Sequence, residues 1–233
     1  GGIAFVFASA TLIMTAYWAH GPNTDEGYLG GLNMNEEIFN WHPVLMVAGM
    51  FFCLITSMLS YRILPLPQSL QKTIHILVHS AAILCISIGL ACVLASDNKK
   101  SKNPYNSYAA NFWSIHSFVG ICAICLYGLN FLLGIFHYVL PGVSITMKQN
   151  FMLNHVFLGT FILITALSAL ESGIMLMTSG CSYNTNKPDY NPVEKYHLLN
   201  DGCQLANNIG IIAIISVFFL FICIISFYYR KNY

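Results

Sequence analysis

Charged side chains are scarce in this sequence of 233 residues: only 8% are Asp, Glu, Lys or Arg, and the formal net charge is +1. A water-soluble domain usually carries about 25%, and a surface that binds nucleic acid needs clustered cations. The scarcity therefore argues against a soluble domain and against a nucleic-acid partner. Glycine-rich phosphate loops, nucleophile elbows and zinc-ligand spacings are also missing, so the sequence gives no support for the functions that depend on them.

Long apolar runs are present instead, and hydrophobic residues make up 56% of the chain. Six runs approach the roughly 20 residues that a helix needs to cross a bilayer. They predict an all-α, multi-pass integral membrane protein with six transmembrane helices in a single domain, residues 1–233. The chain begins at Gly1 without a methionine, so we expect the true start to lie upstream. The six runs are Ile3–Ala19, Trp41–Tyr61, Thr73–Ala95, Phe112–Leu140, Phe151–Thr178 and Ala206–Tyr229.

The links between these runs suggest an orientation in the membrane. Two links are short, Arg62–Lys72 and Pro141–Asn150, and six crossings place both of them and both termini on one side. Lys and Arg are equally numerous on the two sides, but the short-link side holds its five in fewer residues and has no acid. Because cytosolic loops are enriched in Lys and Arg, we predict that the short links and both termini are cytosolic. The sequence does not distinguish the plasma membrane from an endomembrane.

The eight cysteines separate into two groups. Six lie within the apolar runs, where a thiol packs as a small apolar side chain; these include Cys122 and Cys125, whose spacing resembles a redox motif without its usual strand-to-helix context. Cys181 and Cys203 lie at the two ends of the same long, non-cytosolic link. An oxidising compartment on that side favours a disulfide, so we predict that these two cysteines pair.

Four histidines each lie a few residues inside the start of a different apolar run. With six crossings, His42 and His116 lie near the non-cytosolic face, whereas His75 and His155 lie near the cytosolic face. Histidine is costly in hydrocarbon, so four at matching depth indicate a shared function. Two imidazoles per membrane leaflet suit the two axial positions of a haem iron. We therefore predict two b haems, one held by each histidine pair.

Other interpretations of these polar groups stay open. A single histidine near a helix end is more often interfacial than a ligand, and four could instead relay protons in a channel or small transporter. A haem sensor without turnover is a further alternative. His79 lies one helical turn after His75 and competes with it as a ligand. Glu171, inside the fifth run, is either functional or bonded to a hydroxyl such as Ser168 or Ser172.

The segments around the four histidines resemble the haem-binding motifs of the cytochrome b561 family. The resemblance runs from the second helix to the fifth, in the same order and with the same spacing. It implies a six-helix homodimer whose central four helices surround two b haems. Such a protein transfers electrons from cytosolic ascorbate to non-cytosolic monodehydroascorbate or ferric iron. The matching segments are Phe39–Pro43, Lys72–His75, Ser114–Gly120 and Asn154–Gly159.

The resemblance also implies an ascorbate site at the cytosolic haem, formed by Arg62, Lys72 and Lys148. Ascorbate is a monoanion at neutral pH, so three cations at a haem edge would attract and hold it. The alternative is that these side chains only anchor helix ends near lipid headgroups. Relatives often have arginine at the position of Lys148. A lysine there would contact ascorbate as a single point charge, whereas arginine would make a forked contact.

The non-cytosolic acceptor site departs from the family pattern. Relatives carry a histidine in the link before the fourth helix, whereas this chain has Ser96-Asp97-Asn98-Lys99-Lys100. The acceptor, monodehydroascorbate or a ferric chelate, is therefore left open, and a ferric-chelate reductase remains an alternative main role. By position, the candidates for this site are Asp97, Asn98, Tyr105 and Tyr108. Aromatic residues expected either to pack on the outer haem or to form an interfacial belt are Trp41, Phe112 and Trp113.

Overall fold

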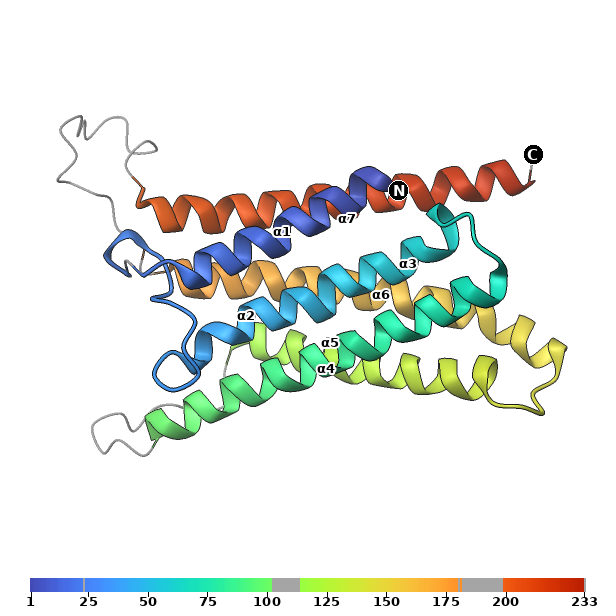
Figure 1. Ribbon diagram of the computed structural model, residues 1–233, viewed down its shortest axis with the longest axis horizontal. Helices are drawn as coiled ribbons and strands as arrows, with labels where there is room; N and C mark the ends of the chain where they lie inside the picture. Colours follow the sequence, from blue (N-terminus) through green and yellow to red (C-terminus); the bar gives the residue numbers. More distant parts are fainter. Residues whose placement is uncertain (23, 102–113, 180, 182–198, 233) are drawn as a thin grey trace.

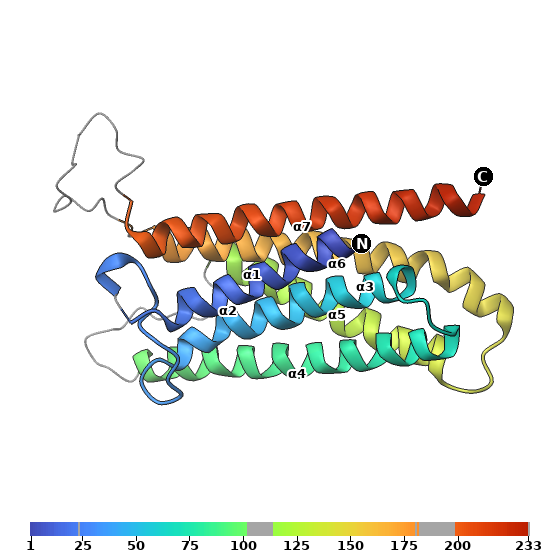
Figure 2. The ribbon, with the colours of Figure 1, turned by 45° about the horizontal axis from the view of Figure 1, so that its top comes forward.

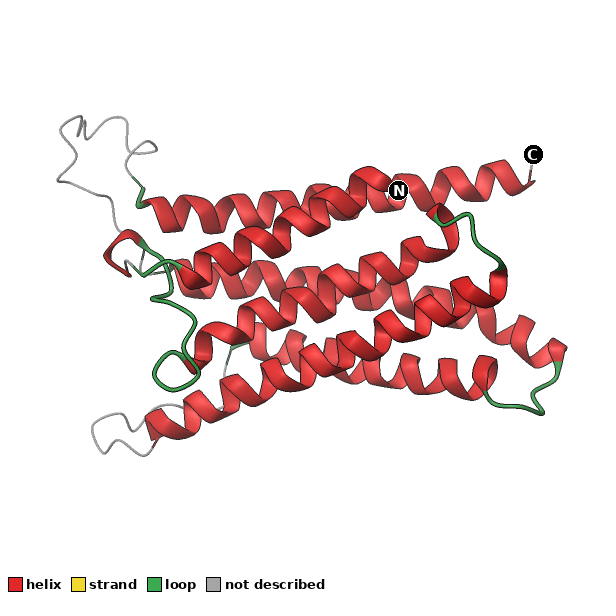
Figure 3. Ribbon diagram, in the orientation of Figure 1, coloured by secondary structure: helices red, strands yellow, loops and turns green. Residues whose placement is uncertain are grey.

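The computed structural model describes residues 1–22, 24–101, 114–179, 181 and 199–232, without the side chains of 98–101 and 227–232. Across these residues the chain is nearly all helix and contains no extended strand (Figure 3). Six helical segments are long and apolar enough to cross a membrane. The predicted fold class and the number of spans are therefore confirmed.

The second and fourth spans are not uniform α-helices. The second consists of three consecutive pieces with a π-helix in the middle, and the fourth ends in a π-helical turn. The long elements are α1 (Gly2–His20), α2 (Trp41–Met46), η3 (Val47–Cys53), α3 (Leu54–Ile63), α4 (Gln68–Ser101), α5 (Ile115–Gly134), η4 (Ile135–Val139), α6 (Ile145–Thr178) and α7 (Asp201–Asn232). Two short 3-10 turns lie in the first long link: η1 (Thr24–Glu26) and η2 (Ile38–Asn40).

The helices lie side by side along the long axis of the molecule (Figures 1 and 2). The two short links lie at one end, on the right in Figure 1, and α1 begins and α7 finishes toward that same end. The helices pack in pairs: α1 against α7, α5 against α6, and the second span against α4. Helices α4 and α5 make little direct contact. Space is therefore left between the α5–α6 pair and the pair formed by α4 and the second span.

Several helices begin earlier than hydropathy predicted, and one begins later. Helix α6 starts at Ile145 because the Ser144 hydroxyl caps it, accepting a hydrogen bond of 3.2 Å from the Met147 N–H. Ser114 caps α5 in the same way through the Ser117 N–H. The prediction that Arg62, Lys72 and Lys148 lie in links is wrong, since all three lie on helices. Polar first and last turns extend these helices beyond the apolar runs.

The first long link is held against the bundle by side-chain hydrogen bonds to its backbone. Asn40 is buried and its Nδ2 donates to the carbonyl oxygens of Leu29 (2.7 Å) and Gly31 (2.8 Å). The indole Nε1 of Trp18 donates to the Gly27 carbonyl at 2.8 Å. Buried amides satisfied in this way resist rearrangement. The link thereby fixes the approach to α2, which begins one residue after Asn40.

The last long link is tied at its two ends by a disulfide between Cys181 and Cys203, whose Cα atoms are 6.2 Å apart. The Cys203 sulfur lies against Gly27, where a Cβ would come within 2.4 Å of it and where φ is +83°. Only glycine tolerates both the positive φ and the close approach. The disulfide thus packs on the first long link, at the same end of the bundle.

Candidate functional site

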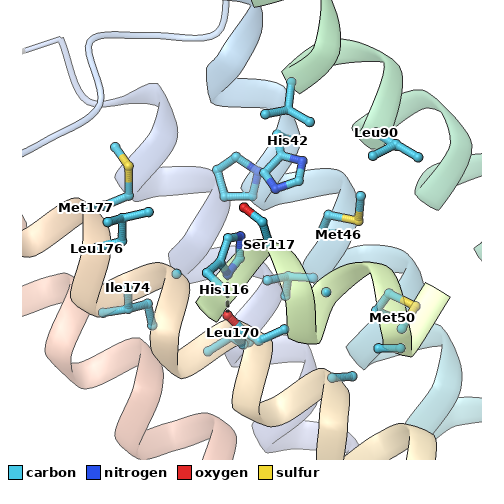
Figure 4. A pocket seen from close by; sticks show the side chains of 18 of the residues that line it. His42, Met46, Met50, Leu90, His116, Ser117, Leu170, Ile174, Leu176 and Met177 are labelled. Carbon is cyan, nitrogen blue, oxygen red and sulfur yellow. Dashed lines mark hydrogen bonds between the residues drawn. The ribbon is translucent and has the colours of Figure 1, made fainter. Parts of the chain in front are cut away.

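The outer histidine pair joins the start of α2 to the first turn of α5, at the long-link end. The ring centres of His42 and His116 are 6.2 Å apart. Figure 4 shows the two imidazoles pointing toward each other across a cavity, with Met46, Met50 and Leu90 around them. Residues 74 positions apart in the sequence are therefore brought together as predicted.

The inner pair joins α4 to α6 near the short-link end. The ring centres of His75 and His155 are 6.4 Å apart. Gly134 lies against the second of these rings, since a Cβ there would be 3.2 Å from the His155 Cε1 atom. The absence of a side chain at this point lets α5 approach the imidazole closely.

Backbone carbonyls orient three of the four imidazoles. The Nδ1 atoms of His42, His75 and His116 lie 3.0, 3.1 and 2.8 Å from the carbonyl oxygens of Gly89, Ser57 and Ala169. A carbonyl oxygen only accepts, so each Nδ1 carries the proton and each Nε2 is left with a free lone pair. This tautomer is the one that ligates a metal through Nε2.

The spacing of both pairs suits a metal ion between the rings. Two metal–imidazole bonds of about 2.0 Å, with about 1.1 Å more from each nitrogen to its ring centre, place the centres about 6.2 Å apart. In the described part of the chain, no group of three or more His, Cys, Asp or Glu side chains is placed to hold a metal. Each pair therefore fits a metal ion whose remaining ligands come from a bound group. A porphyrin is such a group, because it supplies four nitrogen ligands.

Each pair lies in its own chamber. The outer chamber has a volume of about 260 Å³ and the inner chamber of about 650 Å³. Both are lined mainly by apolar side chains, as the face of a porphyrin requires. The chambers adjoin: Phe51 lines the outer one and Leu54, one helical turn further along, lines the inner one. On α6, Ala166 lines the outer chamber and Ile162, one turn away, lines the inner one. Along both helices the linings of the two chambers are therefore about one turn, or roughly 5 Å, apart.

The three basic residues singled out from the sequence all line the inner chamber: Arg62, Lys72 and Lys148. The Lys72 ammonium donates a hydrogen bond to the Tyr138 carbonyl in η4, which links α4 to the end of the fourth span. The Tyr138 hydroxyl in turn donates to the Lys148 carbonyl at 3.1 Å. The π-helical turn thus brings two of the three cation-bearing helices together at the chamber.

His79, the competing ligand, also lines the inner chamber, where its ring lies against His75 and Tyr127. Its Nδ1 is hydrogen-bonded to the Tyr127 hydroxyl, and its ring stacks edge-on against His75 with centres 4.4 Å apart. The His75 ring, by contrast, faces His155 at the spacing expected for axial ligands. The geometry therefore favours His75 as the partner of His155.

Among the candidates for the acceptor site, Asp97 lines the outer chamber, together with Ser114 and Ser117. The other acceptor candidates lie outside the described residues or side chains: Asn98, Tyr105 and Tyr108. The same holds for Phe112 and Trp113, two of the aromatic residues expected beside the outer haem or in an interfacial belt. Trp41 is not among the residues that line the outer chamber. Its position next to His42 in the sequence was therefore a poor guide to contact with the chamber.

Glu171 lies on the opposite side of α6, against α7. A Cβ at Gly210 would come within 2.6 Å of Glu171 Oε2, so the carboxyl occupies the space above that glycine. The expected bond to Ser168 or Ser172 is absent, since both hydroxyls donate to backbone carbonyls of α6. Glu171 is therefore separate from both chambers.

Gly173 was not recognised from the sequence, yet it controls the room available to His116. A Cβ at this position would be 2.8 Å from His116 Cε1, closer than side chains tolerate. We expect Gly173→Ala to displace the imidazole. If each histidine pair holds one haem, as the sequence predicts, the haem content should fall by roughly half, with the deficit in the outer chamber. The pyridine haemochrome absorbance per chain measures this. Gly128→Ala is the control, because nothing lies within 4 Å of a Cβ there, and equal losses in both variants would contradict the assignment.

Known proteins with similar sequences show the family to which this chain belongs. A family model described as eukaryotic cytochrome b561 matches residues 41–179, a range that includes both histidine pairs. The lysosomal membrane ascorbate-dependent ferrireductase of Homo sapiens is 31% identical over 88% of this chain and 79% of its own length. The transmembrane ascorbate ferrireductase 1 of Arabidopsis thaliana is 31% identical, over 74% and 69%. A probable ascorbate-specific transmembrane electron transporter 1 of Oryza sativa subsp. japonica is 32% identical, over 74% and 70%. The chain therefore belongs to the eukaryotic cytochrome b561 family.

Proposed function

We propose that this protein is a transmembrane oxidoreductase that takes electrons from cytosolic ascorbate and delivers them to an acceptor on the far side. Family membership implies a haem b cofactor. The observation that carries the proposal is the pair of facing imidazoles in each of two adjoining chambers, at separations of 6.2 and 6.4 Å. His42 and His116 would hold the outer haem, and His75 and His155 the inner one.

Two b haems would supply a one-electron iron couple at each end of the bundle. With two histidines holding each haem, no position would be left open for oxygen, and the group would supply electron transfer rather than oxygen chemistry. The thin partition between the chambers supports passage from one centre to the next. Relatives described as ascorbate ferrireductases and ascorbate-specific electron transporters support the donor and the two acceptor classes, ferric iron and monodehydroascorbate.

The inner chamber is suited to the donor. Its lining contains three cations, Arg62, Lys72 and Lys148, and no acid among the described residues. These cations would bind the ascorbate monoanion and stabilise its enolate oxygens while it loses an electron to the inner haem. Ascorbate leaves as monodehydroascorbate, having given up one electron and one proton.

The orientation and assembly belong to the same proposal. The three basic residues of the inner chamber lie toward the short-link end, whose Lys and Arg stand in fewer residues and without an acid. The positive-inside rule therefore favours the cytosol for that end and for both termini. The chain would function as a single domain and, on the family resemblance, as a homodimer. These features make ascorbate a cytosolic donor and place the acceptor in the lumen or outside the cell.

The proposal is tested with purified protein in vesicles loaded with ascorbate. We expect two haems per chain, an α-band that appears when ascorbate is added, and reduction of a ferric chelate outside vesicles that exclude ascorbate. Vesicles without protein are the control. Absence of a reducible visible band would favour the proton channel or transporter instead. A reducible band without transfer to any outside acceptor would indicate a haem sensor.

A further inference from the structure

The described residues that line the two chambers carry charges of opposite sign. The inner chamber is lined by three basic residues, whereas Asp97 is the one Asp, Glu, Lys or Arg side chain among the described residues that line the outer chamber. An apolar cavity with one charge of defined sign focuses the electrostatic field at its opening. The outer chamber therefore distinguishes acceptors by charge.

Asp97 lies at the outer edge of this chamber. Four residues of α4 line it at helical spacing, and Asp97 is the last of them along the chain: Leu90, Val93, Leu94 and Asp97. The carbonyl that orients His42 belongs to Gly89, which precedes Asp97 by eight residues, or about 12 Å of helix. The carboxylate is thus offset from the imidazole pair toward the long links, where an acceptor would arrive.

Other oxygen-bearing side chains lie toward the same end. Ser114, which caps α5, and Ser117 line the same chamber as Asp97, and Glu36 and Glu37 are exposed at the same end of the bundle. Lys99 and Lys100 follow Asp97 in the sequence, and their side chains lie outside the described part. A carboxylate is a hard oxygen ligand, which suits a small, highly charged cation.

We infer that Asp97 selects the acceptor: its carboxylate draws a cationic ferric species to the edge of the outer chamber and disfavours anionic monodehydroascorbate. This inference deepens the proposed function and rests on it. The reaction stays a one-electron transfer, in which the ferric species becomes ferrous and one ferric haem per chain is regenerated. Asp97 acts by binding and orienting the acceptor and transfers no proton.

The test uses full-length protein in ascorbate-loaded vesicles and two outside acceptors of opposite charge, hexaammineruthenium(III) and ferricyanide. At low ionic strength we expect Asp97→Asn to slow reduction of the cation by about threefold to tenfold and to leave reduction of the anion equal or faster. The difference between the wild type and Asp97→Asn in reduction of the cation should shrink above about 0.5 M salt, where the Debye length falls below about 5 Å. Asp97→Glu should restore the wild-type preference.

Two controls separate this inference from its alternatives. Asp25→Asn removes an exposed carboxylate at the same end that does not line the chamber, and it should leave the preference unchanged. Haem reduction by internal ascorbate, recorded without an acceptor, should be the same in every variant. Equal slowing of both acceptors, an unchanged preference, or the same shift in Asp25→Asn would overturn the inference. Failure of ascorbate to reduce the wild-type haems would instead overturn the proposed function.

Discussion

Replacing His116 with alanine is expected to reduce the protein from two haems per chain to one and to abolish electron transfer across the membrane. The imidazole faces His42 across the outer chamber with ring centres 6.2 Å apart, and alanine offers no ligand atom in its place. A b haem with one axial histidine missing dissociates far more readily, because the metal bond supplies much of its binding free energy. His42→Ala should have the same effect.

The loss should be confined to one chamber. The inner haem would remain in the His116→Ala variant and would still be reduced by ascorbate. Its proposed ligands, His75 and His155, lie on α4 and α6, whereas the outer pair lies on α2 and α5. Conversely, His75→Ala should keep the outer haem but lose its rapid reduction by ascorbate from the cytosolic side. Iron per chain, together with the amplitude of the ascorbate-reduced α-band, measures both outcomes.

His137→Ala is the matched control for these variants. This imidazole donates through Nδ1 to the Leu133 carbonyl at 2.8 Å and stacks on Phe151, but it does not line the inner chamber. It should keep both haems. Retention of two haems in a His42→Ala, His116→Ala double variant would refute the proposed pairing, and loss of both haems in each single variant would show that the two chambers fold only together.

Much of the fold and of the histidine arrangement followed from the sequence, for a physical reason. Backbone groups in hydrocarbon must be hydrogen-bonded within a helix, so apolar runs of sufficient length predict spans directly. Because consecutive spans alternate in direction, the position of each histidine within its run fixed its membrane leaflet. That reasoning predicted the pairing of His42 with His116 and of His75 with His155 before any distance was known, with His79 left as a competitor of His75.

The features that were missed depend on contacts between helices. The Nδ1 partners are backbone carbonyls, such as that of Gly89, and every residue type has a carbonyl. The π-helical segments η3 and η4 have no simple sequence signal, although each turns the following residues relative to a regular helix. Asp97 was named as an acceptor candidate by position, but its place in the wall of the outer chamber depends on the packing of α4, which hydropathy does not reveal. Hydropathy also started the predicted span too late at α6, where a serine cap and a polar first turn begin the helix at Ile145 rather than Phe151.

The inner chamber allows an equally sharp test. Replacing Lys72 with glutamine is expected to raise the KM for ascorbate by about tenfold to a hundredfold while both haems are retained. A hydrogen bond to a charged group contributes about 1.5 to 3 kcal/mol, which corresponds to that range of affinity. Lys72 precedes His75 by one helical turn on α4, and both residues line the chamber. Its ammonium is therefore placed beside the imidazole that would hold the inner haem.

The alternative is that Lys72 only ties α4 to η4 through the Tyr138 carbonyl. A neutral reductant such as a hydroquinone separates the two roles, because its reaction with the inner haem needs no cation. If Lys72 binds the ascorbate anion, glutamine raises the KM for ascorbate alone, and Lys72→Arg restores most of the affinity because it keeps the charge. High salt should weaken ascorbate binding in the wild type more than in Lys72→Gln. Equal impairment with ascorbate and with the neutral reductant would assign Lys72 to the structure of the chamber and leave Arg62 and Lys148 as the donor site.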